Sequence, residues 1–308
     1  MEEKPKYLPT KDIVFKKMFG EFGNEEITKN FINSITNANV KKVTLDHKLD
    51  LGVESVEKKK MVADIIVKDS TEKKYILEMQ RQSSSGVLKR FFGYMCKIYV
   101  SEIKVKEQYD KLKKVTLILI MEEPLQELKN SKDYHTVIEL AVKSKLELDF
   151  KYIVDIHVIE LSKYKKYRKS NGKIDPWVEL FVNPYGEEME KMQRTREEIR
   201  AAVELLKRLN ADEEVRRIAE LEELNEFFRQ DEEYCIKMEA KAEGVAQGKT
   251  EGIAQGKAEG MKNTKIEIAK NMLKSKMKIE DIMKFTGLSQ NEIDKIAKTE
   301  EEVQIEQG

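Results

Sequence analysis

Three polar side chains stand within or directly beside two apolar segments, and their types are the ones best suited to chemistry. Asp64 lies inside the β-branched run Val62–Val67, and Glu78 and Gln80 lie at the end of the run Tyr75–Met79. A short polar connector separates the two runs, which is the pattern of a strand, a turn and a second strand. Strand side chains alternate between the two faces of a sheet, so each carboxylate shares a face with residues two positions away. Two carboxylates in apolar strands need a structural or chemical reason.

The register of this hairpin decides whether the two carboxylates meet. A turn centred on Thr71 pairs Val67 with Tyr75 and places Asp64 opposite Glu78. Directly opposed residues have Cβ atoms roughly 4.5–5.5 Å apart, and like charges at that separation repel each other. One explanation is a shared cation, because Mg²⁺ takes oxygen ligands and is typically held by one or two carboxylates. The other is that the register slips, or that one carboxylate reaches solvent at the strand end.

The same residues resemble the core motif of a nuclease superfamily. Asp64, a gap of 13 residues and then Glu78-Met79-Gln80 are similar to the PD-(D/E)XK motif, with Gln80 in the place of the usual Lys. The resemblance implies that Asp64 and Glu78 bind Mg²⁺ or another divalent cation, with the Met79 carbonyl as a further ligand. It also implies that Gln80 orients the attacking water. Mg²⁺ would lower the pKa of that water and stabilise charge on the scissile phosphate.

Other segments resemble the Rpn family of recombination-promoting nucleases, which are often labelled transposases. They are PTKDIVFKKMFG at Pro9–Gly20, Arg90 with Tyr94 on the helix after the motif, and the glycine-spaced tail. The resemblance implies that Asp12, Arg90 and Tyr94 support the site. For Asp12 the favoured alternative is a first-turn acid that the helix dipole stabilises. For Arg90 the alternative is an ordinary residue at the rim of a helix–sheet interface, and its place directly after the motif strand favours the functional role.

The order of elements predicts an α/β fold. We expect a restriction-endonuclease-like three-layer core with a mixed central sheet, followed by a helical C-terminal extension. The expected strands are 40–45, 62–67, 75–79, 115–121, 134–142 and 152–161. The expected helices of this core are 10–20, 25–34, one that buries Val87 to Tyr99, and a short one around Trp177.

Composition narrows the class of protein. The chain has 308 residues, and 37% of them are charged, which is above the usual ~25% and predicts long solvated helices. No apolar run approaches the ~20 residues of a membrane span, and Cys96 and Cys235 suggest no disulfide, so we expect a cytoplasmic protein. The net charge of the whole chain is zero, but its two parts differ. Residues 1–185 contain 35 Lys and Arg and 28 Asp and Glu, which gives +7, and residues 186–308 contain 22 and 29, which gives −7. The basic front part suits a polyanionic substrate.

A second basic feature follows the last expected strand. The run Ser162–Lys173 interleaves cations with tyrosines, a composition that suits phosphate contacts and base stacking, although charge runs are usually solvated loops. The candidate DNA-binding residues in it are Lys163, Lys165, Lys166 and Arg168. Of the three histidines, His157 is expected to be structural. His47 and His135 are not followed or preceded by a second ligand at the spacing of a zinc site, so the sequence does not suggest zinc binding.

The tail divides by pattern into three parts beyond a nuclease domain of residues 1–185. Residues 186–243 are expected to form an almost uninterrupted helix. Residues 244–262 carry glycines at a spacing of four, which suits either a flexible linker or a small-residue surface for helix packing. Residues 263–308 form a small module with a helix–turn–helix-like pair, whose acidic residues favour a protein-interaction role over reading a DNA groove.

These patterns lead to one function and two alternatives. We expect a Mg²⁺-dependent DNA endonuclease linked to recombination or mobile-element activity, with DNA as partner and a homo-oligomer formed through the C-terminal helices. The first alternative is a catalytically silent oligomeric adaptor that binds DNA or another protein. The second is transposase-type strand transfer at the same metal site.

Overall fold

The structure is a computed structural model that describes residues 6–46, 63–83, 86–103, 108–145, 153–168 and 172–306. His47, the first residues of the expected strand 62–67 and of the expected strand 152–161, and part of the run Ser162–Lys173 lie outside the described residues. The chain forms two compact units, Met1–Leu224 and Asn225–Gly308.

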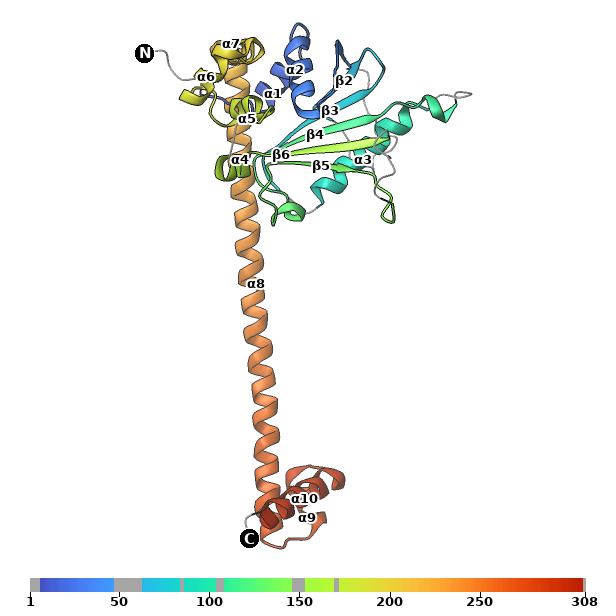
Figure 1. Cartoon of the computed structure of the whole chain (residues 1–308). Helices are drawn as coiled ribbons and strands as arrows, with labels where there is room; N and C mark the ends of the chain where they lie inside the picture. The colour runs from blue at the N-terminus through green and yellow to red at the C-terminus, as the bar shows by residue number, and fades with distance from the viewer. Residues whose placement is uncertain are drawn as a thin grey trace. The chain divides into compact units, whose positions relative to one another are not determined.

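The first unit is built on a mixed six-stranded sheet with the order β1-β2-β3-β4-β6-β5 (Figure 1). Strands β3, β4 and β6 are parallel, and β1, β2 and β5 run antiparallel to their neighbours. Val67 pairs with Tyr75, so the hairpin has the register that the turn centred on Thr71 predicted. The bounds are β1 Val43–Leu45, β2 Ile65–Asp69, β3 Lys74–Gln80, β4 Val115–Met121, β5 His135–Glu139 and β6 Val154–Glu160.

Helices cover both faces of this sheet, which gives the predicted three-layer α/β core. Helix α3 (Val87–Ser101) packs against one face, where it meets alternate residues of the strands such as Ile76 and Leu117. The opposite face, with Leu77 and Ile118, carries a second layer of helices. That layer consists of α1 (Asp12–Gly20), α2 (Glu25–Thr36), α5 (Asp175–Val182), α6 (Glu187–Thr195), α7 (Glu197–Ala211) and the start of α8 (Glu213–Lys274). Shorter elements are α4 (Leu161–Tyr167) and the 3₁₀ turns η1 (Tyr109–Lys111) and η2 (Gln126–Leu128).

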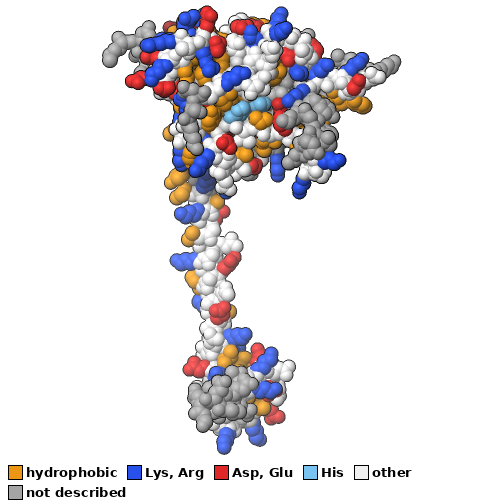
Figure 2. All heavy atoms as spheres, viewed as in Figure 1, with side chains coloured by type: hydrophobic (Ala, Val, Ile, Leu, Met, Phe, Trp, Pro, Cys, Tyr) orange, Lys and Arg blue, Asp and Glu red, His pale blue; other side chains and the backbone are white. Residues whose placement is uncertain are grey.

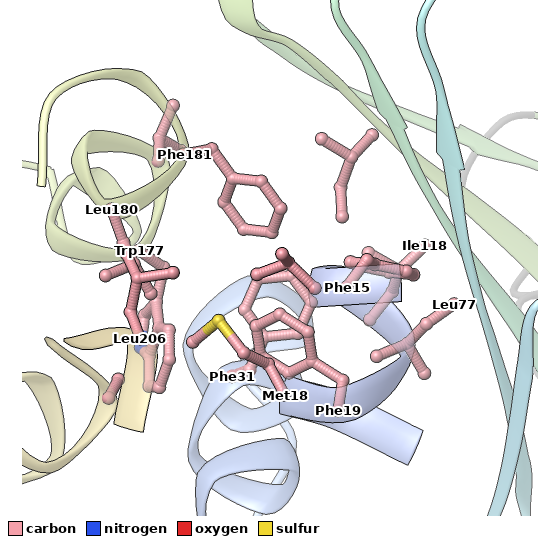
Figure 3. Packing of buried hydrophobic residues seen from close by; sticks show 14 of the residues in the cluster. Phe15, Met18, Phe19, Phe31, Leu77, Ile118, Trp177, Leu180, Phe181 and Leu206 are labelled. Carbon is pink, nitrogen blue, oxygen red and sulfur yellow. The ribbon is translucent and has the colours of Figure 1, made fainter. Parts of the chain in front are cut away.

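Aromatic side chains hold α1 against α2 and α5 within this second layer (Figure 3). The ring of Phe19 stacks on Phe181 at 5.9 Å between centroids and lies 4.7 Å from Phe31. Trp177 meets Phe31 edge to face at 5.5 Å. Ring pairs of this kind add about 0.5–1.5 kcal/mol each beyond the area that they bury. Helix α1, which carries Asp12, is therefore fixed to the core.

The helical region after residue 186 differs from the sequence prediction. Extended backbone at Arg196 and Asp212 separates α6, α7 and α8, so the segment is not one helix. The apolar face of α7, which includes Ile199 and Leu206, is buried in the core of the first unit. The compact core therefore continues to Leu224, well past the boundary expected after residue 185.

The second unit contains most of α8 and a small helical module. Helix α8 continues through the glycines from Gly244 to Gly260, and a Cβ added at any of them would meet no atom within 4 Å. The module is made of α9 (Ile279–Thr286) and α10 (Gln290–Glu306), which pack with the end of α8 around Ile282 and Ile293. Gly287 between them has φ of 66°, a left-handed conformation that glycine adopts without strain.

Candidate active site

Asp64 and Glu78 meet where β2 and β3 come together at the end of β3. Asp64 directly precedes β2, and its main-chain N–H donates a hydrogen bond of 3.1 Å to Oε1 of Glu78. In return, the N–H of Met79 donates a hydrogen bond of 3.1 Å to Oδ2 of Asp64. Each carboxylate is thus held by a backbone amide of the opposite strand. The opposed geometry that the sequence predicted is the observed geometry.

Glu78 is buried and Asp64 is partly buried, and the two acids lie close to each other. Glu78 is 4% exposed, and the side chain of Asp64 is 20% exposed. Burial, followed by the charge of Asp64, raises the pKa of Glu78 well above its usual range. Burial also raises the pKa of Asp64, although the Met79 amide and the Lys16 ammonium oppose the shift. Two carboxylates with raised pKa values in one place favour a proton or a cation between them.

The donor set fits a hard divalent cation better than a soft one. In the parts of the chain that the structure describes, no cluster of three or more His, Cys, Asp and Glu side chains is arranged to hold a metal. Two carboxylates are the protein share that Mg²⁺ typically receives, with the remaining positions left to water or phosphate. The Met79 amide points toward Asp64, and the N–H and C=O of a strand residue point to the same side. The Met79 carbonyl is therefore on the side of the strand that faces the pair.

Gln80 and Arg90 form a direct contact beside the carboxylates. Gln80 is two residues after Glu78 and shares its face of β3, and its Oε1 accepts a hydrogen bond of 2.7 Å from Nη2 of Arg90. The guanidinium of Arg90 also lies 4.6 Å from the centre of the Phe91 ring. Tyr94, one turn further along α3, is 8% exposed. Burial raises its pKa, and Glu78 adds to that shift. The structure thus brings Gln80, Arg90 and Tyr94 to the pair, as the sequence predicted.

Helix α1 adds a cation that the sequence analysis did not identify. Nζ of Lys16 lies 2.7 Å from Oδ2 of Asp12 and 3.7 Å from Oδ1 of Asp64. Asp12 therefore reaches the site through Lys16, and it also raises the pKa of Asp64 by its charge. The signal in the sequence was the i, i+4 spacing of Asp12 and Lys16.

A second residue that the sequence analysis missed comes from α8. Oε1 of Glu222 accepts a hydrogen bond of 3.1 Å from the N–H of Ile13, at the N-terminus of α1. Burial raises the pKa of Glu222, and the charge of Asp12 adds to this shift. Close by, Glu223 pairs with Lys11 at 2.9 Å. The first turns of α8 therefore anchor the helix that carries Lys16.

Comparison with known protein families shows which family the chain belongs to. A family model described as "PD-(D/E)XK nuclease family transposase" matches residues 9–239 of the 308. The chain belongs to this family. A second model, described as "Rpn/YhgA-like nuclease family, C-terminal HTH domain", matches residues 262–298, which agrees with the Rpn resemblance. The chain was also compared with curated proteins and with solved structures, and neither comparison gave a match.

The family match covers α9 and most of α10 with a helix–turn–helix description. The predicted helix–turn–helix-like pair is therefore confirmed as a fold. Its description as an HTH domain within a nuclease family supports DNA binding, whereas the sequence analysis favoured a protein-interaction role because of the acidic residues. No helix in the described part of this PD-(D/E)XK family member combines the length and apolarity that crossing a membrane requires.

The basic run after β6 is only partly available for DNA, and the prediction needs correction at two residues. Lys163 is 4% exposed, and its Nζ binds Oε2 of Glu160 at 2.5 Å and the Leu128 carbonyl at 2.7 Å. Arg168 is held by Asp175 and by Glu179, each at 3.3 Å. Both cations are structural, because each compensates a buried carboxylate. Lys165 and Lys166, also among the candidate residues, are exposed on α4.

The histidines form a pair that the sequence analysis did not find. Nε2 of His135 lies 3.0 Å from Nδ1 of His157, and the two rings stack with centroids 5.2 Å apart. Nε2 of His157 lies 3.3 Å from Oδ2 of Asp155, which also binds Lys114 at 2.7 Å. Histidine side chains are visible at the surface of the first unit in Figure 2. His157 is structural as predicted, and the partner of His135 follows from the antiparallel pairing of β5 with β6.

Proposed function

We propose that the protein is a divalent-metal-dependent DNA endonuclease that hydrolyses phosphodiester bonds. The observation that carries the proposal is the pair of the partly buried Asp64 and the buried Glu78, in which each carboxylate is hydrogen-bonded by an amide of the opposite strand. A bound Mg²⁺ or similar cation would polarise the scissile phosphate and lower the pKa of a bound water. Asp64, Glu78 and the Met79 carbonyl are the residues that would hold it.

The remaining polar groups have distinct roles in this proposal. The carboxamide of Gln80 is oriented by Arg90 through its oxygen, which leaves its N–H₂ group to position a water or a phosphate oxygen. The guanidinium of Arg90 supplies positive charge that a Gln in place of Lys does not. Lys16 holds Asp64 from the other side and limits the repulsion between the acids. Tyr94, buried one turn after Arg90 on α3, would support the site from that helix.

DNA contacts outside the site come from two places. Lys165 and Lys166 on α4 extend the basic surface of the nuclease unit, and the helix–turn–helix module is the second DNA-binding element. The family description as a transposase supports a role in recombination or the movement of mobile elements. Strand transfer instead of hydrolysis would use the same carboxylates and a DNA 3′-hydroxyl as the nucleophile.

A plasmid assay tests the proposal. The full-length protein with Mg²⁺ should convert supercoiled plasmid to nicked and linear forms, and EDTA should prevent this. Asp64→Asn and Glu78→Gln should each slow cutting by at least about a hundredfold, since each removes a charge that stabilises the transition state. Asp110→Asn is the matched control, because Asp110 is exposed and far along the chain from the site. A catalytically silent adaptor gives no Mg²⁺-dependent cutting, and cutting that persists in both variants would reject the assigned residues.

A further inference from the structure

A groove in the nuclease unit is lined mainly by cations and aromatic rings. It lies between the segment that leads into β5, the end of α4 and the segment that leads into α5. Its wall includes Lys132, Tyr134, Lys166, Tyr167 and Lys173. It also includes the carboxylate of Asp133, which accepts a hydrogen bond of 3.1 Å from the hydroxyl of Ser131. The nuclease function described above assigns no role to Lys132, Tyr134 or Lys173.

The lysines of the groove have no anionic partner in the described part of the chain. Nζ of Lys173 donates to the neutral Oδ1 of Asn37 at 3.0 Å. Nζ of Lys132 and Nζ of Lys166 lie over the ring of Tyr167, at 6.0 Å and 5.2 Å from its centre. A tyrosine ring attracts cations but does not neutralise them. The groove therefore presents three exposed ammonium groups, unlike the ion-paired Arg168 in the same wall.

The groove lies at the same end of the sheet as the carboxylate pair. Gln80 pairs with Met121, and Met121 pairs with Glu160. The N–H of Glu160 donates a hydrogen bond of 2.8 Å to the carbonyl of Tyr134 in the groove. Three strand spacings of about 4.8 Å put Tyr134 roughly 14 Å from Gln80. That distance corresponds to about four nucleotides at the rise of about 3.4 Å per nucleotide in B-DNA.

We propose that the groove formed by Lys132, Lys166 and Lys173 binds a backbone phosphate of DNA, about four nucleotides from the phosphodiester at the carboxylate pair. The choice of DNA as ligand rests on the proposed nuclease function, but binding at the groove does not require cutting. Ammonium groups bind phosphate without reading the base, so the groove fixes the position of the DNA rather than its sequence. Tyr167 positions two of the three lysines.

The test measures DNA affinity with full-length protein in EDTA, so that no cutting occurs. The groove variant replaces Lys132, Lys166 and Lys173 with Gln. The control variant removes the same number of charges from exposed lysines outside the groove, by the substitutions Lys41→Gln, Lys42→Gln and Lys113→Gln. Both variants keep the helix–turn–helix module, so its contribution to DNA binding is common to all three proteins. A fluorescent 30-base-pair duplex is titrated at several salt concentrations.

The groove variant should bind on the order of tenfold more weakly, and the slope of log K against log salt should become shallower by about one, the value for one lost phosphate contact. The control variant should change affinity by less than threefold. In addition, Tyr167→Ala should weaken binding, whereas Tyr167→Phe, which keeps the ring, should not. If the groove variant does not fold, which its circular dichroism will show, Lys132→Gln alone should still weaken binding by about threefold.

Equal affinities and salt slopes for the groove and control variants would overturn the proposal. The outcome is separate from that of the cutting assay. A wild-type protein that cuts plasmid while the groove variant binds like the control rejects the groove alone. A wild-type protein that never cuts, combined with weak binding by the groove variant, rejects the nuclease function and keeps the groove as a DNA-binding site.

Discussion

Replacing Glu78 with Gln should stabilise the protein while it abolishes cutting. The side chain is 4% exposed, and burial and Asp64 raise its pKa well above the usual range. A raised carboxyl pKa means that the folded state binds the proton more tightly than the unfolded state, so stability falls as pH rises toward the folded pKa. Gln keeps the Oε1 that accepts the Asp64 amide hydrogen bond and removes the charge. We expect the change to remove the electrostatic penalty and little else.

The expected gain in the free energy of unfolding at pH 8 in EDTA is about 1–2 kcal/mol, within the range of about 0.5–2 kcal/mol that a single stabilising substitution commonly gives. For a unit of this size each kcal/mol corresponds to about 2–4 °C, so the melting temperature should rise by roughly 2–8 °C. The gain should vanish below about pH 4, where the carboxyl group is protonated in the unfolded chain as well.

Magnesium should offset most or all of the difference in stability between the two proteins. If the site binds Mg²⁺ with a dissociation constant of about 1 mM, then 10 mM Mg²⁺ stabilises the wild type by roughly 1.4 kcal/mol and leaves Glu78→Gln unchanged. Thermal melts followed by circular dichroism, in EDTA and in 10 mM Mg²⁺, measure both effects. The reasoning fails if Glu78→Gln is less stable than wild type in EDTA, or if Mg²⁺ stabilises both proteins equally.

Four further substitutions, which test three predictions, have defined outcomes. Lys16→Met removes the ammonium group 3.7 Å from Asp64 and should slow plasmid cutting by roughly tenfold; an unchanged rate at saturating Mg²⁺ would leave Lys16 with a structural role only. Gln80→Leu and Arg90→Ala each break the same hydrogen bond. The variant with both changes should therefore cut plasmid no more slowly than the slower of the two single variants. If the two losses of cutting rate add up in the double variant, the residues do not share a role. Burial and the neighbouring histidine lower the pKa of His135 to about 4, so the unfolded chain takes up a proton first as pH falls. This one histidine should therefore lower the free energy of unfolding by about 2 kcal/mol between pH 8 and pH 5. Urea denaturation at the two pH values should show a decrease that is smaller by this amount in His135→Gln than in the wild type.

The sequence predicted that Asp64 and Glu78 oppose each other because the geometry of this pair is local. Asp64 and Glu78 belong to one hairpin, and period-2 alternation together with a short turn determines which residues oppose each other. The position of Arg90 near the pair could be predicted in the same way, because its helix directly follows the strand that carries Glu78. These predictions depend on separations of a few residues, where chain connectivity restricts the alternatives.

The residues that were missed or misassigned depend on long-range packing. Glu222 lies 209 residues from the amide that it accepts, and nothing in the local pattern of α8 indicates that contact. Lys163 was read as an exposed cation because it stands in a basic run, although its i, i+3 spacing to Glu160 signalled an ion pair. His135 meets His157 through the register of two strands joined by a long connection, and that register was not specified by a turn.

The paired amide contacts of Asp64 and Glu78 also have a consequence for folding. A slip of one residue in the β2–β3 hairpin would turn the side chains of the slipped strand to the opposite face of the sheet. Asp64 would then be buried on the face that α1 covers with its aromatic side chains. In the native register the two carboxylates lie side by side, each held by an amide of the opposite strand, and there they would be placed to share one ion. A divalent cation present during synthesis would thus act as a template, selecting the correctly aligned hairpin from its misaligned competitors before the parallel strands of the sheet assemble on it.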